Sequence, residues 1–269
     1  VPTPRPRRRL PAALLVITFL TTLLSGFLLT AEGLIATNAL FAHPGTTLES
    51  ILFGGPAAWL DAAWALLRLG GPYSLSLMAF FAAHEMGHFL ACRHYGVWAT
   101  WPHFLPGPPL IGTFGAVIRM RGPIPHRRAL FDIGVAGPLA GFCVALPVLA
   151  IGVMRSELVA AEPLPPGAQS LVFGDSLLTR GLSLLLRPET SSGFELVADP
   201  VFVAGWVGML ATVMNLLPAG QFDGGHIVFA VLPRQHRAIS VLVAAGLWGL
   251  VLYYALVPGE FSAWTVWAV

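Results

Sequence analysis

Two histidines separated by three residues, with a glutamate directly after the first, are the part of the sequence best suited to chemistry. They stand in His84-Glu85-Met86-Gly87-His88, near the end of the apolar run 72–92. A helix places side chains four positions apart on one face, so the two imidazoles can hold one zinc ion while Glu85 stays free to act on water at the metal. In soluble helices the motif also occurs by accident, as hydrogen-bonded histidines beside a buried acid. Inside a membrane span ionisable side chains are costly, which favours the metal site.

A catalytic zinc takes a third protein ligand and leaves the fourth position to water. Asp223 is the best candidate, because it lies between two apolar runs, in the segment from Asn215 to His226, where an acid without a partner is hard to explain. Pro218 and Gly220 are expected to end the preceding helix, so that the chain can turn the carboxylate toward the metal. The alternative is a solvated loop at the end of a span, and the upstream histidine pair makes it the weaker interpretation.

The composition places these residues in a membrane protein. Hydrophobic residues make up 56% of the 269 positions and charged residues only 10%, whereas soluble domains carry about 25% charged residues to solvate their surface. So low a charged fraction predicts that most of the surface faces lipid. The net charge of +2 gives no case for nucleic-acid binding, and two cysteines make neither a disulfide framework nor a zinc knuckle.

The chain is expected to cross the membrane five times. Residues 48–70 contain Glu49, Asp61 and Arg68 and are interrupted by Gly and Pro, so we expect them to lie in the interface rather than to cross. With five spans most arginines gather on one side, and the positive-inside rule places the N-terminus and the loops 93–128 and 232–238 in the cytoplasm. The predicted spans are 11–30, 72–92, 131–154, 201–217 and 238–257.

The two motifs together resemble the paired signature of the site-2 protease family. HEMGH is followed about 130 residues later by N-x-x-P-x-x-x-x-D-G, and residues 112–119 and 131–141 resemble the family's membrane-associated strand and its second core helix. The closest likeness is to the bacterial and plastid branch, which lacks a PDZ domain. The resemblance implies an all-α polytopic membrane protein with a three-helix core, flanking transmembrane helices and a short membrane-associated β-hairpin. It divides the chain into an N-terminal span with an interfacial segment (1–71), the catalytic membrane core (72–232) and a C-terminal span (233–269).

The same resemblance implies roles for single residues. His84, His88 and Asp223 are the implied ligands of one zinc ion per chain. Glu85 is the implied general base and proton shuttle, and Asn215 helps to hold the substrate carbonyl or the developing oxyanion. The implied activity is hydrolysis of peptide bonds within or beside the transmembrane segments of other membrane proteins.

Two other functions remain as alternatives. A catalytically silent scaffold of the same fold would be expected to lack Glu85 or one of the metal ligands, and all of these residues are present. A metal transporter could use the same ligands to line a pathway. Transporters usually carry an internal repeat, whereas this sequence shows none, and Glu85 would have no task there.

The segment from Gly112 to Met120 is predicted to dock a transmembrane substrate. Thr113, Phe114 and Val117 favour extended structure, and the glycines of the segment allow close approach of another backbone. A strand in lipid must pair within the protein, line a wet cavity or take a partner, because unpaired backbone groups are costly there. A hairpin with one free edge meets these conditions by β-addition of the substrate. The alternative is a structural hairpin that only caps the site.

Overall fold

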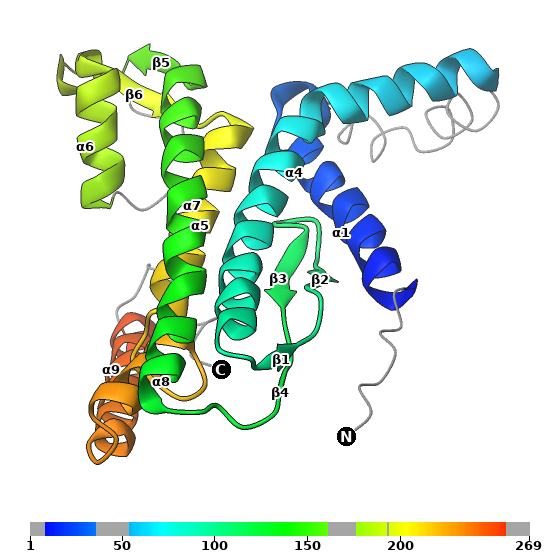
Figure 1. The fold of residues 1–269 in the computed structure, drawn as a ribbon. Coiled ribbons are helices and arrows are strands. Elements are labelled where there is room, and N and C mark those ends of the chain that lie inside the picture. Colours follow the sequence, from blue (N-terminus) through cyan, green and yellow to red (C-terminus); the bar gives the residue numbers. More distant parts are fainter. Residues whose placement is uncertain (1–8, 36–53, 161–175, 193, 257–269) are drawn as a thin grey trace.

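The computed structural model describes residues 9–35, 54–160, 176–192 and 194–256, which form mainly helices and three pairs of short strands (Figure 1). The fold class predicted from the sequence, a helical polytopic membrane protein with a small β-hairpin, is confirmed. The helices are α1 (Arg9–Leu28), α4 (Gly55–His94), α5 (Arg127–Arg155), α6 (Leu177–Leu186), η1 (Pro188–Ser192, a 3-10 helix), α7 (Pro200–Asn215), α8 (Asp223–Val231) and α9 (His236–Leu256).

Four of the described helices, α1, α4, α5 and α9, are long and apolar enough to cross a membrane. The fifth predicted span, 201–217, corresponds to α7, which has 16 residues. At 1.5 Å per residue such a helix measures about 24 Å, less than the hydrocarbon core of roughly 30 Å. α7 is largely buried among the other helices, so its backbone is shielded by protein and it need not match the membrane thickness by itself.

The helices α4, α5 and α7 pack together, and α1 lies on the other side of α4 (Figure 1). Glycines allow α5 and α7 to come very close. A Cβ atom added at Gly152 of α5 would lie 2.3 Å from the Cα atom of Phe202, and one added at Gly205 of α7 would lie 2.7 Å from the Cα atom of Leu149. Small residues at contacts are the means by which membrane helices pack without a hydrophobic driving force between them.

The long helix α4 changes direction along its length (Figure 1), and it contains Pro72 in its interior, preceded by Gly70 and Gly71. Its first part lies across one end of the bundle, and the remainder runs beside α5 (Figure 1). A proline inside a helix removes one backbone hydrogen bond and bends the helix. The part before the bend exposes Trp59 and Trp64, as expected for a segment that lies in the membrane interface. The predicted interfacial segment is thus continuous with the span that follows it; its residues 48–53 lie outside the described part of the chain.

A β-hairpin lies between α1 and α4 (Figure 1). In it β2 (His103–Pro106) pairs antiparallel with β3 (Thr113–Val117), and β1 (Trp98–Ala99) pairs with β4 (Met120–Arg121). α1 holds the turn of this hairpin, because the Thr21 hydroxyl donates a hydrogen bond of 2.6 Å to the Gly112 carbonyl. The segment 112–120 therefore forms a strand, as predicted, followed by the start of a second one.

The pairing of β2 with β3 contains a bulge. Leu105 faces Gly115 and Pro106 faces Thr113, so that Phe114 has no residue opposite it. The Thr113 hydroxyl bridges the irregular place by donating to the Leu105 carbonyl at 2.7 Å and accepting from the Gly115 N–H at 2.9 Å. The bulge directs the Phe114 side chain outward, and this residue is 75% exposed.

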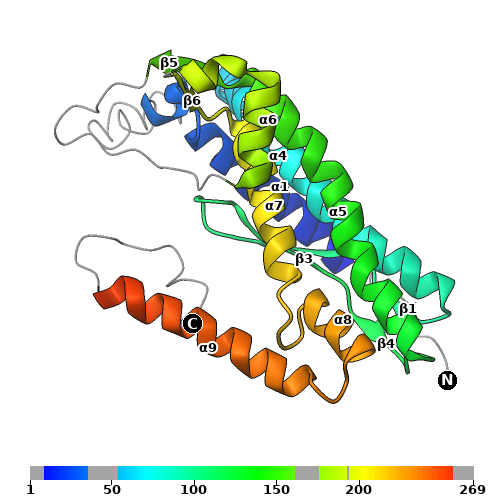
Figure 2. The same cartoon turned by 90° about the vertical axis from the view of Figure 1, so that its left-hand side faces the viewer.

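The helix α9 stands apart from the bundle and is joined to it through α8 (Figure 2). Only 6% of its apolar stretch is buried. Lipid is the environment in which so exposed an apolar helix is stable.

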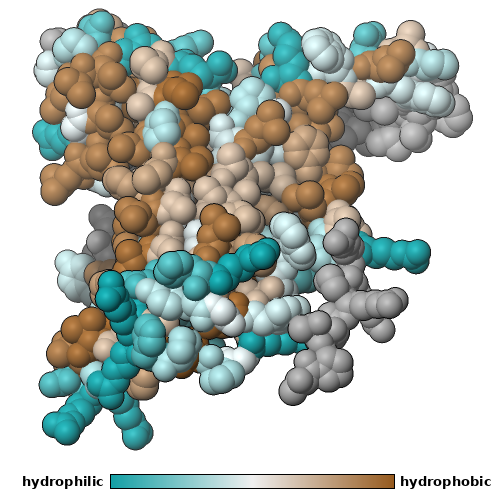
Figure 3. All heavy atoms as spheres, in the orientation of Figure 1, coloured by the Kyte–Doolittle hydropathy of each residue, from teal (hydrophilic) through white to brown (hydrophobic). Residues whose placement is uncertain are grey.

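Most of the described arginines gather at one end of the molecule, as the sequence predicted for one side of the membrane. This arginine-rich end comprises the end of α4, the strand β4, the start of α5 and the connection between α8 and α9. It is the hydrophilic lower part of Figure 3. Its arginines include Arg93, Arg119, Arg121, Arg127, Arg128, Arg234 and Arg237.

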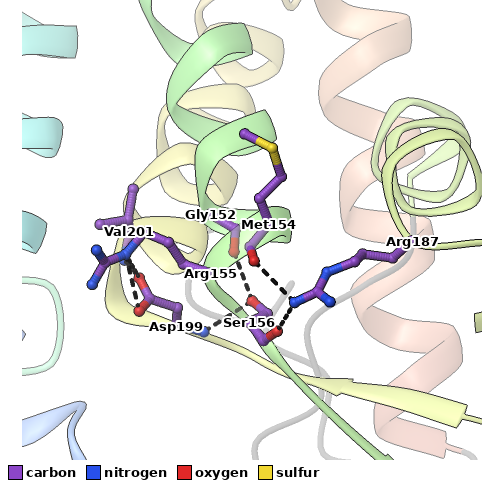
Figure 4. A network of polar contacts seen from close by, with 7 residues as sticks. All are labelled: Gly152, Met154, Arg155, Ser156, Arg187, Asp199 and Val201. Carbon is purple, nitrogen blue, oxygen red and sulfur yellow. Dashed lines mark hydrogen bonds and ion pairs between the residues drawn. The ribbon is translucent and has the colours of Figure 1, made fainter.

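At the opposite end a polar network ties α5 to α7 (Figure 4). The Arg155 Nε atom donates to both carboxylate oxygens of Asp199, at 3.2 and 3.3 Å, and Asp199 caps α7 by accepting from the Val201 N–H at 2.8 Å. The Asp199 N–H donates to the Ser156 hydroxyl, and Arg187 donates to the Ser156 carbonyl. The sequence predicted none of the structure here, neither α6 nor the strands β5 (Glu157–Ala160) and β6 (Phe194–Val197).

Replacing Asp199 with alanine is expected to lower the free energy of unfolding by about 1–2 kcal/mol, because α7 loses its N-cap hydrogen bond. The ion pair adds little, since the Arg155 side chain is 52% exposed. Thermal unfolding of the purified protein in detergent measures the change. Glu195→Ala, which removes an exposed acid from β6, is the matched control, and an equal effect of both substitutions would contradict the role of the cap.

Candidate metal centre

His84 and His88 lie one turn apart on α4, and both are buried. Their Nε2 atoms are 3.2 Å from each other. The helix therefore places the two imidazoles side by side, as their spacing in the sequence predicted. The ionisable rings are in a place where water is largely excluded, although they lie only a few residues from the end of α4.

Asp223 reaches the histidines because the chain turns back after α7. The turn contains Pro218 and Gly220, and Gly220 adopts a positive φ of 54°, a conformation that favours glycine. The next helix, α8, begins at Asp223 itself, and the turn packs closely on it. A Cβ atom added at Gly224 would lie 2.2 Å from the Leu216 carbonyl oxygen. The Asp-Gly pair of the motif thus supplies both the carboxylate and the space for the turn.

The carboxylate closes a triangle of three potential ligand atoms. One Asp223 oxygen, Oδ2, lies 3.3 Å from the His84 Nε2 atom and 3.2 Å from the His88 Nε2 atom. A tetrahedral ion with bonds of about 2.0–2.1 Å sets its ligand atoms about 3.3 Å apart. The three distances fit that value, and among the described residues these three form the group suited to a metal ion.

A backbone carbonyl orients His88 for this task. The His88 Nδ1 atom donates a hydrogen bond of 2.7 Å to the Ile133 carbonyl, which leaves a lone pair on Nε2 in the neutral ring. That lone pair faces another nitrogen and a carboxylate oxygen at hydrogen-bond distance. Three acceptor atoms so close together repel one another unless a cation or a proton lies between them, and a metal ion satisfies all three at once.

Glycines of α5 make room for the two rings. A Cβ atom added at Gly137 would lie 2.0 Å from the His88 Nε2 atom, and one added at Gly141 would lie 3.2 Å from the His84 Nδ1 atom. On the facing helix, a Cβ atom at Gly87 would lie 2.3 Å from the Ala136 carbonyl oxygen. The close contact of α4 with α5 is therefore what shapes the walls of the site.

A hydrogen bond at the arginine-rich end holds α4 and α5 together near this contact. The Tyr95 hydroxyl, just beyond α4, donates to the Asp132 carboxylate, which also pairs with Arg128. This hydrogen bond raises the pKa of Tyr95 above its ordinary value, so the hydroxyl keeps its proton. Asp132 directly precedes Ile133, and the bond thus holds the α5 turn whose carbonyl orients His88.

The remaining two candidate residues lie beside the triangle. Glu85 is buried, and its carboxylate lies close to the backbone N–H of Ile118, just past β3. The Asn215 Nδ2 atom, at the end of α7, is 3.4 Å from the His84 Nε2 atom. All five residues singled out in the sequence are thus brought to one place, by α4, α7 and α8.

Sequence reasoning missed the groups that support these five residues. The sequence did not show that the space at Gly137 and Gly141 receives the His84 and His88 rings. The Ile133 carbonyl and the Ile118 N–H are backbone groups, and the sequence carries no signal for them. Tyr95 and Asp132 form a pair only because two helix ends meet.

Comparison with known proteins gives the family. The model described as Peptidase family M50 matches residues 72–256. The chain belongs to this family, that of the site-2 proteases, and the resemblance noted in its sequence is confirmed. The four long apolar helices and the family together identify an integral membrane protein.

Similar proteins are plant metalloproteases. The "Probable zinc metalloprotease EGY2, chloroplastic" of Oryza sativa subsp. indica is 34% identical over 186 residues, 69% of this chain and 33% of that protein. EGY2 of Arabidopsis thaliana is 30% identical over 232 residues, covering 84% and 40%. "Probable zinc metalloprotease EGY1, chloroplastic" of Oryza sativa subsp. japonica is 33% identical over 178 residues, covering 64% and 30%. The chain thus spans about a third of the length of these relatives.

Gly137→Ala is expected to abolish tight metal binding while the protein still folds. The new methyl group would occupy the position of the His88 ring and push its Nε2 atom away from the other two ligand atoms. Metal analysis of the purified protein after dialysis measures the loss. Gly71→Ala is the control, because a Cβ atom at this position of α4 meets no other atom within 4 Å. Full metal content in the Gly137 variant would contradict the geometry.

Proposed function

We propose that the chain is a membrane-embedded zinc metalloprotease that hydrolyses peptide bonds within or beside the transmembrane segments of other membrane proteins. The observation that carries this proposal is the buried triangle of His84, His88 and Asp223 with a carboxylate, Glu85, next to it. Membership of a peptidase family and the name "zinc metalloprotease" of the relatives support it.

One zinc ion per chain is the proposed cofactor. The Nε2 atoms of His84 and His88 and the Asp223 carboxylate would hold it, with the fourth position left for water. Bound zinc supplies Lewis-acid chemistry, lowering the pKa of water from about 15.7 to near 7. The orientation of His88 by the Ile133 carbonyl fits this use, since it leaves the ligand nitrogen unprotonated.

Glu85 is the proposed general base. It adjoins the proposed ligand His84 in the sequence, and the backbone N–H of Ile118 lies close to its carboxylate. A carboxylate at this position can take a proton from the attacking water and return it to the amine that leaves. Its burial excludes bulk water, which strengthens its interactions with charge that develops during the reaction.

Asn215 is the proposed partner of the substrate carbonyl. Its Nδ2 atom lies close to the metal ligand His84, and an amide N–H at that position can donate to an oxygen that gains negative charge. The side chain comes from the last residue of α7, directly before the turn that leads to Asp223. One helix end thereby serves both the substrate and the metal.

The arginine-rich end is the proposed cytoplasmic side, by the positive-inside rule. The triangle lies in the half of α4 toward this end, which gives water a short path to it. We assign residues 72–232 to the catalytic membrane core, because all five candidate residues fall within it. Residues 1–71 then form the N-terminal span with its interfacial segment, and residues 233–269 the C-terminal span.

The segment from Gly112 to Met120 is the proposed docking strand for a transmembrane substrate. A helical peptide bond is shielded by its own backbone, so the substrate must unwind near the site. β3 is bonded to β2 along one edge, and the chain just beyond it touches Glu85. A substrate strand added beside β3 would place its backbone next to the general base. The exposed Phe114 ring offers it an apolar contact.

Glu85→Gln is expected to abolish proteolysis, a loss of at least about a hundredfold, while one zinc ion per chain is retained. The amide has the same shape as the carboxyl group, but it cannot take up a proton at neutral pH. Cleavage of a model transmembrane substrate and metal analysis are the two measurements. His88→Ala is the control that should lose both. Activity of the Gln variant within a few-fold of wild type would contradict the mechanism, and a zinc-loaded wild type that cleaves nothing would favour the silent scaffold.

Phe114→Ala is expected to raise the KM for a transmembrane substrate several-fold and to leave zinc content unchanged, because the ring contacts the substrate and not the metal. Steady-state cleavage in detergent measures it. Leu110→Ala removes another exposed apolar side chain, from the turn before β3, and should have little effect. Equal KM values for both variants and wild type would favour a hairpin that only caps the site.

A further inference from the structure

Acidic side chains are scarce at the arginine-rich end. Among the described residues only Glu85, Asp132 and Asp223 lie there, and each is engaged in the contacts described above. The other described acids lie toward the opposite end of the molecule: Glu32, Asp61, Glu157, Glu189, Glu195 and Asp199. The surface of the arginine-rich end is therefore strongly positive, and it has no free carboxylate in the described part of the chain.

Two of its arginines are held in place, Arg119 through its backbone and Arg121 also through its side chain. The Arg119 N–H donates to the Thr100 hydroxyl, and its carbonyl accepts from the Thr100 N–H, both at 2.9 Å. Arg121 is paired with Trp98 across β1 and β4, and its guanidinium lies over the Trp98 ring, 5.4 Å from the ring centroid. Both arginines are exposed, and no carboxylate of the described residues forms an ion pair with either.

These arginines directly follow the proposed catalytic position. Ile118, whose backbone N–H lies close to the Glu85 carboxylate, is the neighbour of Arg119 in the chain. A substrate that lies along β3 past Glu85 must leave the membrane beside β4, whichever way its chain runs. The residues just outside its transmembrane segment then come to lie within reach of Arg119 and Arg121.

We propose that Arg119 and Arg121 form a subsite that selects substrates with aspartate or glutamate immediately outside the transmembrane segment, on the arginine-rich side. This inference rests on the proposed function. Ordinary membrane segments carry lysine and arginine on that side, and the two fixed arginines repel them. The subsite thereby both attracts an acidic flank and rejects the commoner basic one, and specificity is built from attraction and repulsion together.

An acidic peptide fits these two arginines better than an anionic lipid headgroup does. An anionic lipid headgroup attracts any exposed arginine at the interface and does not require a particular arrangement of arginines. Arg234 and Arg237, at the same end, are sufficient for such an interaction. Arg121 instead lies in β4, which is paired with β1, and Arg119 directly precedes β4 in the segment that continues from β3. The positions of Arg119 and Arg121 are therefore determined by the segment that runs from β3 to β4.

The test uses three model substrates that are identical except for two flanking residues on the arginine-rich side, which are Asp, Ser or Lys. The zinc-loaded full chain is placed in vesicles of neutral lipid, so that headgroup charge does not contribute. Wild type is expected to cleave the Asp substrate on the order of tenfold faster than the Lys substrate, with Ser between them. R119E/R121E is expected to reverse this order, with unchanged zinc content.

R234E/R237E is the matched control, because it makes the same change of charge at the same end but away from β3. It should keep the wild-type order of substrates. Equal cleavage of all three substrates by wild type would overturn the proposal, and so would an equal shift of preference in both double variants, since the selectivity would then come from net charge. A uniform loss for R119E/R121E with all substrates would also overturn it and indicate contacts with the membrane.

Binding provides a readout that does not depend on turnover. The same three substrates, fitted with a photocrosslinking group, are offered to the Glu85→Gln protein, and captured complex is quantified. Preferential capture of the Asp substrate, reversed by R119E/R121E in the same background, supports the subsite even if wild type cleaves none of the three. That outcome would count against the proposed protease activity alone. Equal capture of the three substrates would overturn the subsite.

Discussion

Three acceptor atoms, the Nε2 atoms of His84 and His88 and one carboxylate oxygen of Asp223, meet within 3.3 Å of one another in a part of the molecule shielded from water. Lone pairs so arranged repel unless a cation or a proton lies among them, and a buried charge without a partner is costly. The rest of the fold follows from holding this arrangement. α4 supplies two of the atoms, and α7 and its turn must bring the third back to α4.

α5 is the frame on which these atoms are aligned. It contributes no ligand, yet it orients His88 through the Ile133 carbonyl and leaves space for the ring at Gly137. Glycine inside a helix costs about 1 kcal/mol relative to alanine, so the glycines of α5 lower the stability of the isolated helix. They also permit contacts closer than any side chain would allow, and in lipid such contacts are what holds helices together. The glycines therefore lower the helix propensity of α5, but they allow the close contacts that shape the site.

The β-hairpin is the one place where extended backbone enters the helical bundle. Polar groups between β2 and β3 are satisfied by pairing and by the Thr113 hydroxyl, and the Gly112 carbonyl in the turn accepts from α1, in line with the need to pair backbone groups at membrane depth. The chain just past β3 lies close to Glu85 and then continues into the exposed strand β4. A peptide lying along it would be in contact with the proposed general base, Glu85, and with Arg119 at the same time.

The sequence alone was sufficient for the class of protein, the helical core, the strand at 112–120 and all five candidate residues of the site. Composition and the spacing of His84 and His88 are local properties that the sequence shows directly. An acid between apolar runs is unfavourable without a partner, wherever in the fold that partner lies, so Asp223 could be singled out without the structure. The joining of the interfacial segment to α4, the bulge that exposes Phe114, and the small sheet and helix within 155–200 did not follow. They depend on which backbones approach one another.

The tertiary structure alone decided how the site is supported. The groups of Ile133 and Ile118 that support the site are a backbone carbonyl and a backbone N–H. Nearly every residue of any chain has both groups, so no pattern of residue types can mark these two. Tyr95 and Asp132 are 37 positions apart and pair only because α4 ends where α5 begins its second turn. Residue types determine which atoms can bind a metal or move a proton. Packing determines which of the many identical backbone groups stand beside them, because that choice depends on helix positions set by the whole bundle.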